Sequence, residues 1–142
     1  MSSAWFALPH ERRTTFLTQR DGSKAGLREG DRISMRGLLY GLMLPSGNDA
    51  AYAIAAHIGE KRLGRNCSSV RPLIAQFVKM MNRRAKAAGA EMSHFANPDG
   101  YHNSHHFSTG YDLALIAGEA MNRALFRTLK VCPEVCLERQ TG

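Results

Sequence analysis

Ser46 and Asn48 are the residues of this 142-residue chain whose types and spacing most favour chemistry. They place a hydroxyl and a carboxamide two residues apart, with Gly47 between them, on a turn that follows an apolar run. A tight turn holds two polar groups at a fixed separation, and preorganised polar groups are what the wall of an active site requires. A helix is expected to begin at this turn, and the partial positive charge at its N-terminus favours an anion.

The sequence around the turn carries more information than the Ser-X-Asn triplet, which alone is typical of a helix cap. Four segments, in order, resemble the serine-type D-alanyl-D-alanine carboxypeptidases, which are low-molecular-mass penicillin-binding proteins. They are LLYGLMLPSGNDAA at 38–51, FANPDGY at 95–101, HFST at 106–109 and YDLALI at 111–116. The resemblance spans residues 22–129, and several motifs in the order of the family are more specific than any one of them.

In that family, Ser-X-X-Lys supplies the nucleophile and a base, Ser-X-Asn lines the opposite wall, and Lys-Thr-Gly on a strand receives the substrate. The resemblance implies that Ser46 joins the proton-transfer network around the nucleophile and the leaving group. It also implies that Asn48 hydrogen-bonds the substrate amide, while Gly47 allows the turn to pack tightly. Ser46 and Asn48 are therefore the predicted catalytic residues, and Ser46, Gly47 and Asn48 the predicted substrate-binding residues.

The chain departs from the family pattern at the other two motifs. No serine has a lysine three positions later, since Ser23 and Lys24 are adjacent. Near the C-terminus, Gln140-Thr141-Gly142 lacks the positive charge of Lys-Thr-Gly, and we interpret it as a coincidence. A serine hydroxyl needs a nearby base to become a good nucleophile. We therefore expect that this chain alone neither hydrolyses a D-Ala-D-Ala peptide nor reacts covalently with a fluorescent penicillin.

The resemblance also implies a fold, a reaction and a location. We expect a mostly α chain, the helical lobe of the DD-peptidase and β-lactamase-like α/β fold, with little or no sheet. The implied reaction is acyl transfer at the D-Ala-D-Ala end of peptidoglycan stem peptides, with β-lactams as inhibitors and no metal or organic cofactor. The family acts outside the cytoplasmic membrane. Residues 1–6 show no secretory signal, so we expect export or membrane association to depend on segments absent from this chain.

Three regions are expected: an irregular lead-in over residues 1–21, the helical lobe over 22–129 and a divergent tail over 130–142. A short strand is expected near 16–18. Start and stop signals predict four helices: Met35–Met43 after an N-cap at Ser34, Ala50–His57 after Asn48 or Asp49 and before Gly59, Pro72–Ala88 before Gly89, and one that begins at Thr109 and Asp112. We interpret Asp49 and Asp112 as helix caps rather than as paired catalytic carboxylates. The last helix is expected to bury Leu113, Ile116, Ala117, Ala120, Met121 and Ala124.

The net charge of +7 leaves a binding function open beside the enzymatic one. Lys79, Arg83 and Lys86 share one face of a predicted helix, which would suit a basic nucleic-acid-binding helical domain. No matching motif or interleaved aromatic residues accompany them, so we interpret them as a solvated surface and expect no nucleic-acid partner. A non-catalytic binding or scaffold protein that kept the helical lobe is the other alternative.

Histidines form a second cluster with possible chemistry in one predicted loop. His94, His102, His105 and His106 are residue types that could ligate zinc or copper. A loop does not guarantee the geometry of a metal site, and no His-Glu-X-X-His helix is present. We therefore interpret these histidines as surface or packing residues and predict no metal site.

Overall fold

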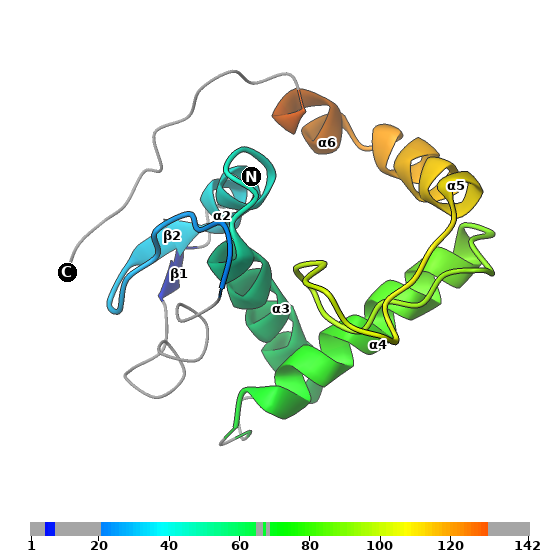
Figure 1. The fold of residues 1–142 in the computed structure, drawn as a ribbon. Coiled ribbons are helices and arrows are strands. Elements are labelled where there is room, and N and C mark those ends of the chain that lie inside the picture. The colour runs from blue at the N-terminus through cyan, green and yellow to red at the C-terminus, as the bar shows by residue number, and fades with distance from the viewer. Residues whose placement is uncertain (1–4, 8–20, 65–66, 68, 131–142) are drawn as a thin grey trace.

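The computed structural model describes residues 5–7, 21–64, 67 and 69–130, and most of these residues are helical (Figure 1). The helices are α2 (Met35–Met43), α3 (Asn48–Leu63), α4 (Arg71–Ala87), α5 (Gly110–Met121) and α6 (Ala124–Leu129). Two short strands, β1 (Trp5–Ala7) and β2 (Arg32–Ser34), pair in an antiparallel register that sets Phe6 opposite Ile33. The prediction of a mostly α chain with little sheet is confirmed.

Parts of the predicted terminal regions lie outside the described residues. This holds for the strand expected near 16–18 and for residues 131–142 of the tail. The strand β1 lies within the segment that the sequence predicts to be irregular, so sequence analysis missed it. None of the helices in the described ranges is long and apolar enough to cross a membrane.

The helix α2 begins where the sequence predicts it. The hydroxyl of Ser34 accepts a hydrogen bond from the backbone N–H of Gly37 at 3.1 Å, as expected of an N-cap. The start of α3 differs from the prediction. Its N-cap is Gly47, which offers no side-chain oxygen, so neither Asn48 nor Asp49 is the cap. Both residues lie inside the first turn of the helix, where their side chains serve other contacts.

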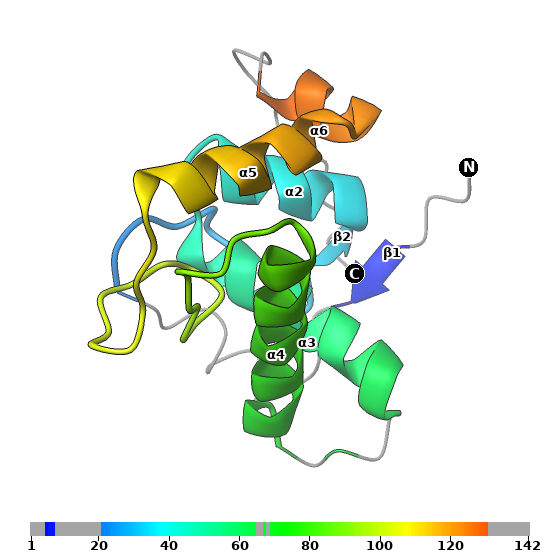
Figure 2. The same cartoon turned by 90° about the vertical axis from the view of Figure 1, so that its right-hand side faces the viewer.

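Gly59 does not end α3, as the sequence predicts, because the helix continues through it to Leu63. Gly59 is buried where α3 packs against α4, the most extensive contact between described elements (Figure 2). A Cβ at Gly59 would overlap the carbonyl oxygen of Leu73 and lie 2.7 Å from its carbonyl carbon. The missing side chain therefore permits a close helix crossing and does not act as a stop signal.

The hydrophobic core lies between α2, α3, α4 and β2. Ile33 of β2, Leu38 of α2 and Leu73 of α4 are among the most deeply buried side chains. They surround the alanine-rich start of α3, which is buried from its second residue onward because its small side chains let neighbours approach. The helix α4 runs nearly as predicted. Pro72 lies in its first turn, and Gly89, with a φ of +85°, follows its end.

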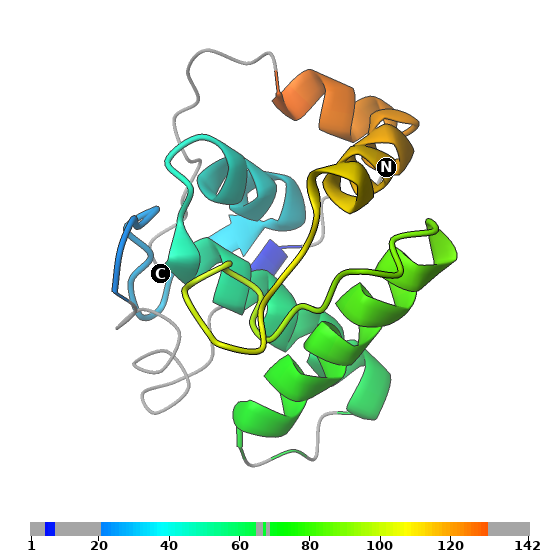
Figure 3. The same ribbon diagram turned by 45° about the vertical axis from the view of Figure 1, so that its right-hand side comes forward.

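The start of α5 is also as predicted, because Thr109 Oγ1 accepts a hydrogen bond from the backbone N–H of Asp112 at 3.1 Å. The predicted buried face of this helix is wrong. Asp112 is its only buried residue, and Leu113 is 52% exposed. The helix contacts α6 and runs above α4 in Figure 3, and the described elements cover only part of its apolar face. The other expected core positions are exposed (Ala117, Ala124) or half-buried (Ile116, Ala120, Met121).

Candidate active-site wall

Ser46 lies at the corner between α2 and α3 in a conformation that serine seldom adopts. Its φ is +55°, and it is the one described residue other than glycine with a positive φ. The left-handed region costs an L-residue about 1–2 kcal/mol, so surrounding contacts must hold it there, as is common at functional sites. The side chain is exposed, and its hydroxyl makes no hydrogen bond within the described part of the chain. The hydroxyl is therefore available to a ligand.

Packing and a hydrogen bond at Gly47 help to hold this corner in its conformation. It is buried, and its backbone N–H donates to the carbonyl of Gly41 at 3.1 Å. A Cβ at Gly47 would lie 2.6 Å from that same carbonyl oxygen and 2.8 Å from the backbone nitrogen of Ala25. Such contacts are closer than real side chains tolerate, so glycine lets α2, α3 and the segment before β2 meet.

Asn48 lies half-buried beside Ser46, and its amide is partly engaged. Nδ2 donates to the backbone carbonyl of Asp21 at 2.6 Å, and the backbone N–H donates to the carbonyl of Ser23 at 2.9 Å. Gly22, at a φ of +87°, passes so close that a Cβ there would lie 2.8 Å from Nδ2. The Oδ1 atom accepts no hydrogen bond from any residue that the structure describes. One acceptor of the carboxamide therefore remains available.

Asp49 is an anchor of the corner rather than a helix cap or a catalytic carboxylate. It is 1% exposed, and its two oxygens accept backbone N–H bonds from Ala25 at 2.8 Å, Leu27 at 2.9 Å and Ala50 at 2.9 Å. The first turn of a helix also favours a negative charge. These bonds connect the segment before β2 to the first turn of α3, at the residue that follows Asn48.

A polar pocket of about 360 Å³ opens beside this corner. Asp21, whose carbonyl holds Asn48, lines it together with Tyr52 of α3. The opposite side comes from the loop between α4 and α5, within the segment that resembles the family. Ser46 and Asn48 do not line the pocket itself, and Asn48 is joined to it through its hydrogen bond to Asp21. The loop residues in the lining are Ala96, Asn97, Asp99, Tyr101, His102 and Asn103.

Side-chain networks that sequence analysis missed hold both ends of this loop. Asn82 of α4 binds the backbone of Phe95 in both directions, donating from Nδ2 and accepting at Oδ1, each at 2.8 Å. Ser93 donates to the buried carboxylate of Asp112 at 2.7 Å and accepts from the hydroxyl of Ser108 at 2.7 Å. Asp112 therefore anchors the loop, and the cap of α5 is Thr109. The available signal was a polar Asn82 on the inner face of an otherwise apolar helix stripe.

The four histidines of the loop do not converge on one point. His94 Nδ1 lies 2.6 Å from the backbone carbonyl of His105, and the ring of His106 meets the edge of Phe95 at 5.4 Å between centroids. His102 lines the polar pocket instead. Among the described residues, no three His, Cys, Asp or Glu side chains are grouped so that they could hold a metal ion.

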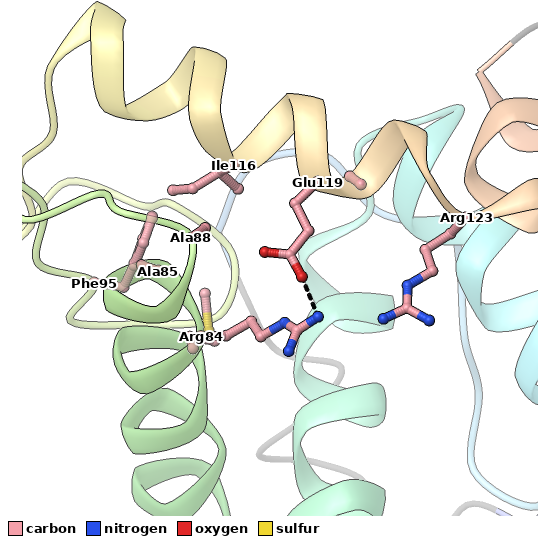
Figure 4. Close-up of a pocket in the computed structure, with 9 residues that line it drawn as sticks. Arg84, Ala85, Ala88, Phe95, Ile116, Glu119 and Arg123 are labelled. Atoms are coloured by element: carbon pink, nitrogen blue, oxygen red, sulfur yellow. Dashed lines mark hydrogen bonds and ion pairs between the residues drawn. The ribbon is translucent and has the colours of Figure 1, made fainter.

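An apolar groove of about 410 Å³ separates α4 from α5 (Figure 4). Ile116 of α5 faces Ala85 and Ala88 of α4 across it, with Phe95 at one end. Its rim is charged: Arg84 forms an ion pair with Glu119, and the Arg123 side chain extends toward the same space. This groove is where the apolar face of α5 lacks a covering partner.

Comparison with known proteins identifies the family to which these features belong. Residues 10–140 match the family model described as D-alanyl-D-alanine carboxypeptidase. The chain belongs to this family. It is 41% identical over 107 residues to the D-alanyl-D-alanine carboxypeptidase of Streptomyces sp. (strain K15), an alignment covering 75% of this chain and 35% of that protein. It is 33% identical over 100 residues to DacF of Bacillus subtilis (strain 168), covering 70% of this chain and 23% of the relative.

Solved structures show the same fold. The Streptomyces K15 DD-transpeptidase superimposes with a TM-score of 0.76 at 36% identity, over 89% of this chain and 46% of that chain. The D-alanyl-D-alanine carboxypeptidase DacD from Francisella tularensis gives a TM-score of 0.71 at 29% identity, over 89% of this chain and 26% of that chain. The chain thus spans less than half the length of these relatives, and it matches the helical lobe of this fold.

Proposed function

We propose that this chain forms the Ser-X-Asn wall of a serine-type D-alanyl-D-alanine carboxypeptidase. The observation that carries the proposal is the corner at Ser46. The backbone of Ser46 has a φ of +55°, and its hydroxyl is exposed. The neighbouring Asn48 carboxamide has a free acceptor. The close packing at Gly47 and the hydrogen bonds of the buried Asp49 hold the backbone that carries both side chains. A preorganised pair of this kind is suited to a transition state, because its reorganisation cost is met on folding.

In the proposed reaction, a serine nucleophile outside this chain attacks the carbonyl between two terminal D-alanines. The Ser46 hydroxyl relays a proton from the side of the nucleophile to the leaving amine nitrogen, so that D-alanine departs as a neutral amine. Asn48 Oδ1 accepts a hydrogen bond from the substrate amide N–H and keeps the carbonyl in line for attack. Water then resolves the acyl-enzyme. The proposed chemistry requires no metal or organic cofactor.

The proposed substrate is the peptidoglycan stem peptide, and β-lactams would inhibit the complete site by acylating the same nucleophile. The proposed place of action is the cell envelope, outside the cytoplasmic membrane. The polar pocket of about 360 Å³ beside Asn48 supports a peptide substrate, because its amide and hydroxyl groups can bind an extended backbone. The proposed scissile bond lies on the Ser46 side of this pocket.

The rest of the proposed enzyme would cover the groove between α4 and α5. The apolar faces of Ile116, Ala120 and Phe95 line this groove, and burying them would stabilise the two parts together. The proposed second part would also cover Leu113 of α5, which is 52% exposed and is not among the residues that line the groove. The supported assembly is thus a site between this helical part and a second part that carries the nucleophile.

A chimera tests the proposal. Residues 22–129 would replace the matching segment of the Streptomyces relative, which then supplies the remaining motifs. We expect the chimera to react with a fluorescent penicillin. Ser46→Ala should lower the acylation rate by about 100-fold, a normal effect for a lost proton-transfer group. Ser104→Ala, in the exposed part of the loop, is the matched control and should react normally.

Two outcomes would contradict the proposal. The first is a folded chimera, with a cooperative thermal transition, that penicillin does not label. The second is an equal loss of labelling for Ser46→Ala and Ser104→Ala. Labelling of the isolated 142-residue chain would show that the nucleophile lies within it and that Ser46 has been given the wrong role.

A further inference from the structure

A second pocket, of about 630 Å³, lies on the other side of the 93–107 loop. Lys79 and Lys86 line it from α4, and His94, Asn103 and His105 line it from the loop. No aspartate, glutamate or arginine is among its lining residues in the described structure. Both lysines are exposed on α4, as expected of a solvated helix face, and a loop that carries two imidazoles shares the pocket with them. The floor of the pocket is apolar, formed by Ala75, Val78, Phe95 and Ala96.

The loop side of this basic pocket is fixed in place. The backbone N–H of His94 donates to the carbonyl of Phe107 at 2.8 Å, and the return bond is 3.0 Å. The two rings stack with centroids 5.9 Å apart. Asn82 holds Phe95 at the next position. A pocket whose wall is ordered before binding loses less entropy when a ligand arrives.

The charge of the pocket is positive, because Lys79 and Lys86 are the charged residues of its lining. His94 Nδ1 must carry a hydrogen, because the carbonyl of His105 at 2.6 Å can only accept. Asp112 lies behind Ser93 of the pocket wall, but its carboxylate is 3% exposed and already accepts a hydrogen bond from Ser93. The accessible groups are thus cations and neutral donors.

The spacing of the lysines selects the kind of anion. Lys79 and Lys86 are two helical turns apart, which is about 10 Å along the axis of α4. This spacing suits a polymer with repeated anionic groups, because neighbouring groups of the polymer can each contact one ammonium group. Lysine binds phosphate oxygens as a point charge, without the bidentate geometry that arginine offers to carboxylate and phosphate. The apolar floor would hold the neutral linkers between the charges.

Nucleic acid fits the pocket less well than a polymer without bases. Single strands gain affinity when their bases stack on exposed aromatic rings. Phe95 is the one phenylalanine, tyrosine or tryptophan among the lining residues of this pocket, and it is half-buried with its ring perpendicular to that of His106. The described lining of this pocket therefore offers charge for a phosphodiester backbone but no freely exposed ring of phenylalanine, tyrosine or tryptophan.

We propose that this basic pocket binds an anionic polymer of the cell envelope whose repeat units are joined by phosphodiesters. Asn103 and Ala96 line both this pocket and the polar pocket beside Asn48, so a bound polymer would lie next to the pocket proposed for the peptide. The polymer's source rests on the proposed envelope function, whereas the binding chemistry does not. Such a contact would retain the enzyme close to its wall substrate.

The test measures binding of a synthetic oligo(glycerol phosphate) to the 142-residue chain by calorimetry at low salt. The double variant Lys79→Gln and Lys86→Gln should weaken binding by about tenfold, because two contacts to phosphate are lost. The double variant Lys79→Arg and Lys86→Arg keeps both charges and should bind within about twofold of the parent. Lys61→Gln removes one exposed charge from α3, outside the pocket, and serves as the matched control.

Specific outcomes decide the proposal. Loss of binding in the glutamine pair, with retention in the arginine pair and in Lys61→Gln, supports it. No binding by the parent chain, or an equal loss for Lys61→Gln, overturns it. Tighter binding of single-stranded DNA than of the glycerol-phosphate oligomer would favour a nucleic-acid ligand instead. Binding of inorganic phosphate with equal affinity would show that one anion suffices. These measurements need no nucleophile, so their failure is separate from failure of the acyl-transfer proposal.

Discussion

The side-chain amide of Asn48 donates a hydrogen bond to the backbone carbonyl of Asp21, with 2.6 Å between nitrogen and oxygen. The carbonyl can only accept, so this bond fixes which way the carboxamide faces. It joins the first turn of α3 to the segment that leads into β2. Asn48 therefore has a structural contact on Nδ2 and a separate acceptor, Oδ1, for the proposed substrate. The two roles can be separated by substitution.

Asn48→Ala should lower the free energy of unfolding by about 1 kcal/mol, the usual net value of one hydrogen bond. Asn48→Asp should cost more, about 2 kcal/mol, because a carboxylate oxygen would face the carbonyl of Asp21 without a proton between them. Urea denaturation at neutral pH measures both values. A more stable Asp than Ala variant would contradict the observed orientation of the amide.

Gly59→Ala tests the crossing of α3 and α4. The new methyl would overlap the backbone of Leu73, and overpacking of this kind costs about 1–3 kcal/mol. Gly118→Ala in α5 is the matched control, because no atom lies within 4 Å of the position its Cβ would take. Alanine should there stabilise the helix by about 0.5–1 kcal/mol. Opposite signs in urea denaturation are the expected result, and a common sign would place the helix crossing elsewhere.

His57 makes stability depend on pH. Burial lowers its pKa below 6.5, the nearby Lys61 lowers the pKa further, and Glu60 opposes them. The unfolded chain then binds the proton more tightly than the folded chain. The contribution of His57 to the free energy of unfolding is therefore fully present above pH 6.5. It is lost as the pH falls through 6.5 and then through the lower pKa of the folded state.

The measurement compares urea denaturation in this pH window for three chains. His57→Gln should remove this part of the pH dependence. Lys61→Gln should reduce it less, because burial is the larger cause of the shift. A parent chain that loses no more stability than His57→Gln on acidification would contradict the prediction.

Asn82→Ala should release the loop that forms one wall of the polar pocket. The substitution leaves the backbone N–H and carbonyl of Phe95 without their partner, at bonds now 2.8 Å long. Hydrogen exchange of residues 93–107 should accelerate by about tenfold, which corresponds to about 1.4 kcal/mol of lost protection. Asn122→Ala, an exposed residue after α5, is the control. Equal exchange in both variants would show that other contacts hold the loop.

Local signals in the sequence predicted the elements that depend on neighbouring residues. Ser34 and Thr109 cap helices because each hydroxyl reaches an N–H three residues later, and Gly89 ends α4 through its own φ. The role of Gly59 could not be predicted, because glycine occurs both where a helix ends and where two helices cross closely. Local pattern also cannot show that Asn82 lies opposite Phe95.

The candidate site divides in the same way. The Ser46–Asn48 corner was predicted because its residues are contiguous and lie in a family-like segment. The pocket beside it was not predicted, since it forms where Asp21, Tyr52 and a distant loop come together. For α5, the apolar stripe was recognised, but a stripe does not say which partner covers it. The error at Leu113 was thus an error about the partner, not about the helix.

That uncovered face leads to the last prediction. Apolar surface around Leu113 and Ile116 should make the isolated chain self-associate, because association removes this surface from water. The double variant Leu113→Gln and Ile116→Gln should weaken association by about tenfold or more in sedimentation equilibrium. Its unfolding free energy should change by less than about 1 kcal/mol, because neither side chain is fully buried.

Leu63→Gln provides the matched control, since this leucine is 46% exposed at the end of α3, away from the groove. It should leave association unchanged. If Leu63→Gln weakened association as strongly as the α5 variant, general apolar stickiness would explain the result. A parent chain that stays monomeric at high concentration would mean that the groove closes on itself in solution. Weakening in the α5 variant alone would identify this face as the surface through which the chain associates.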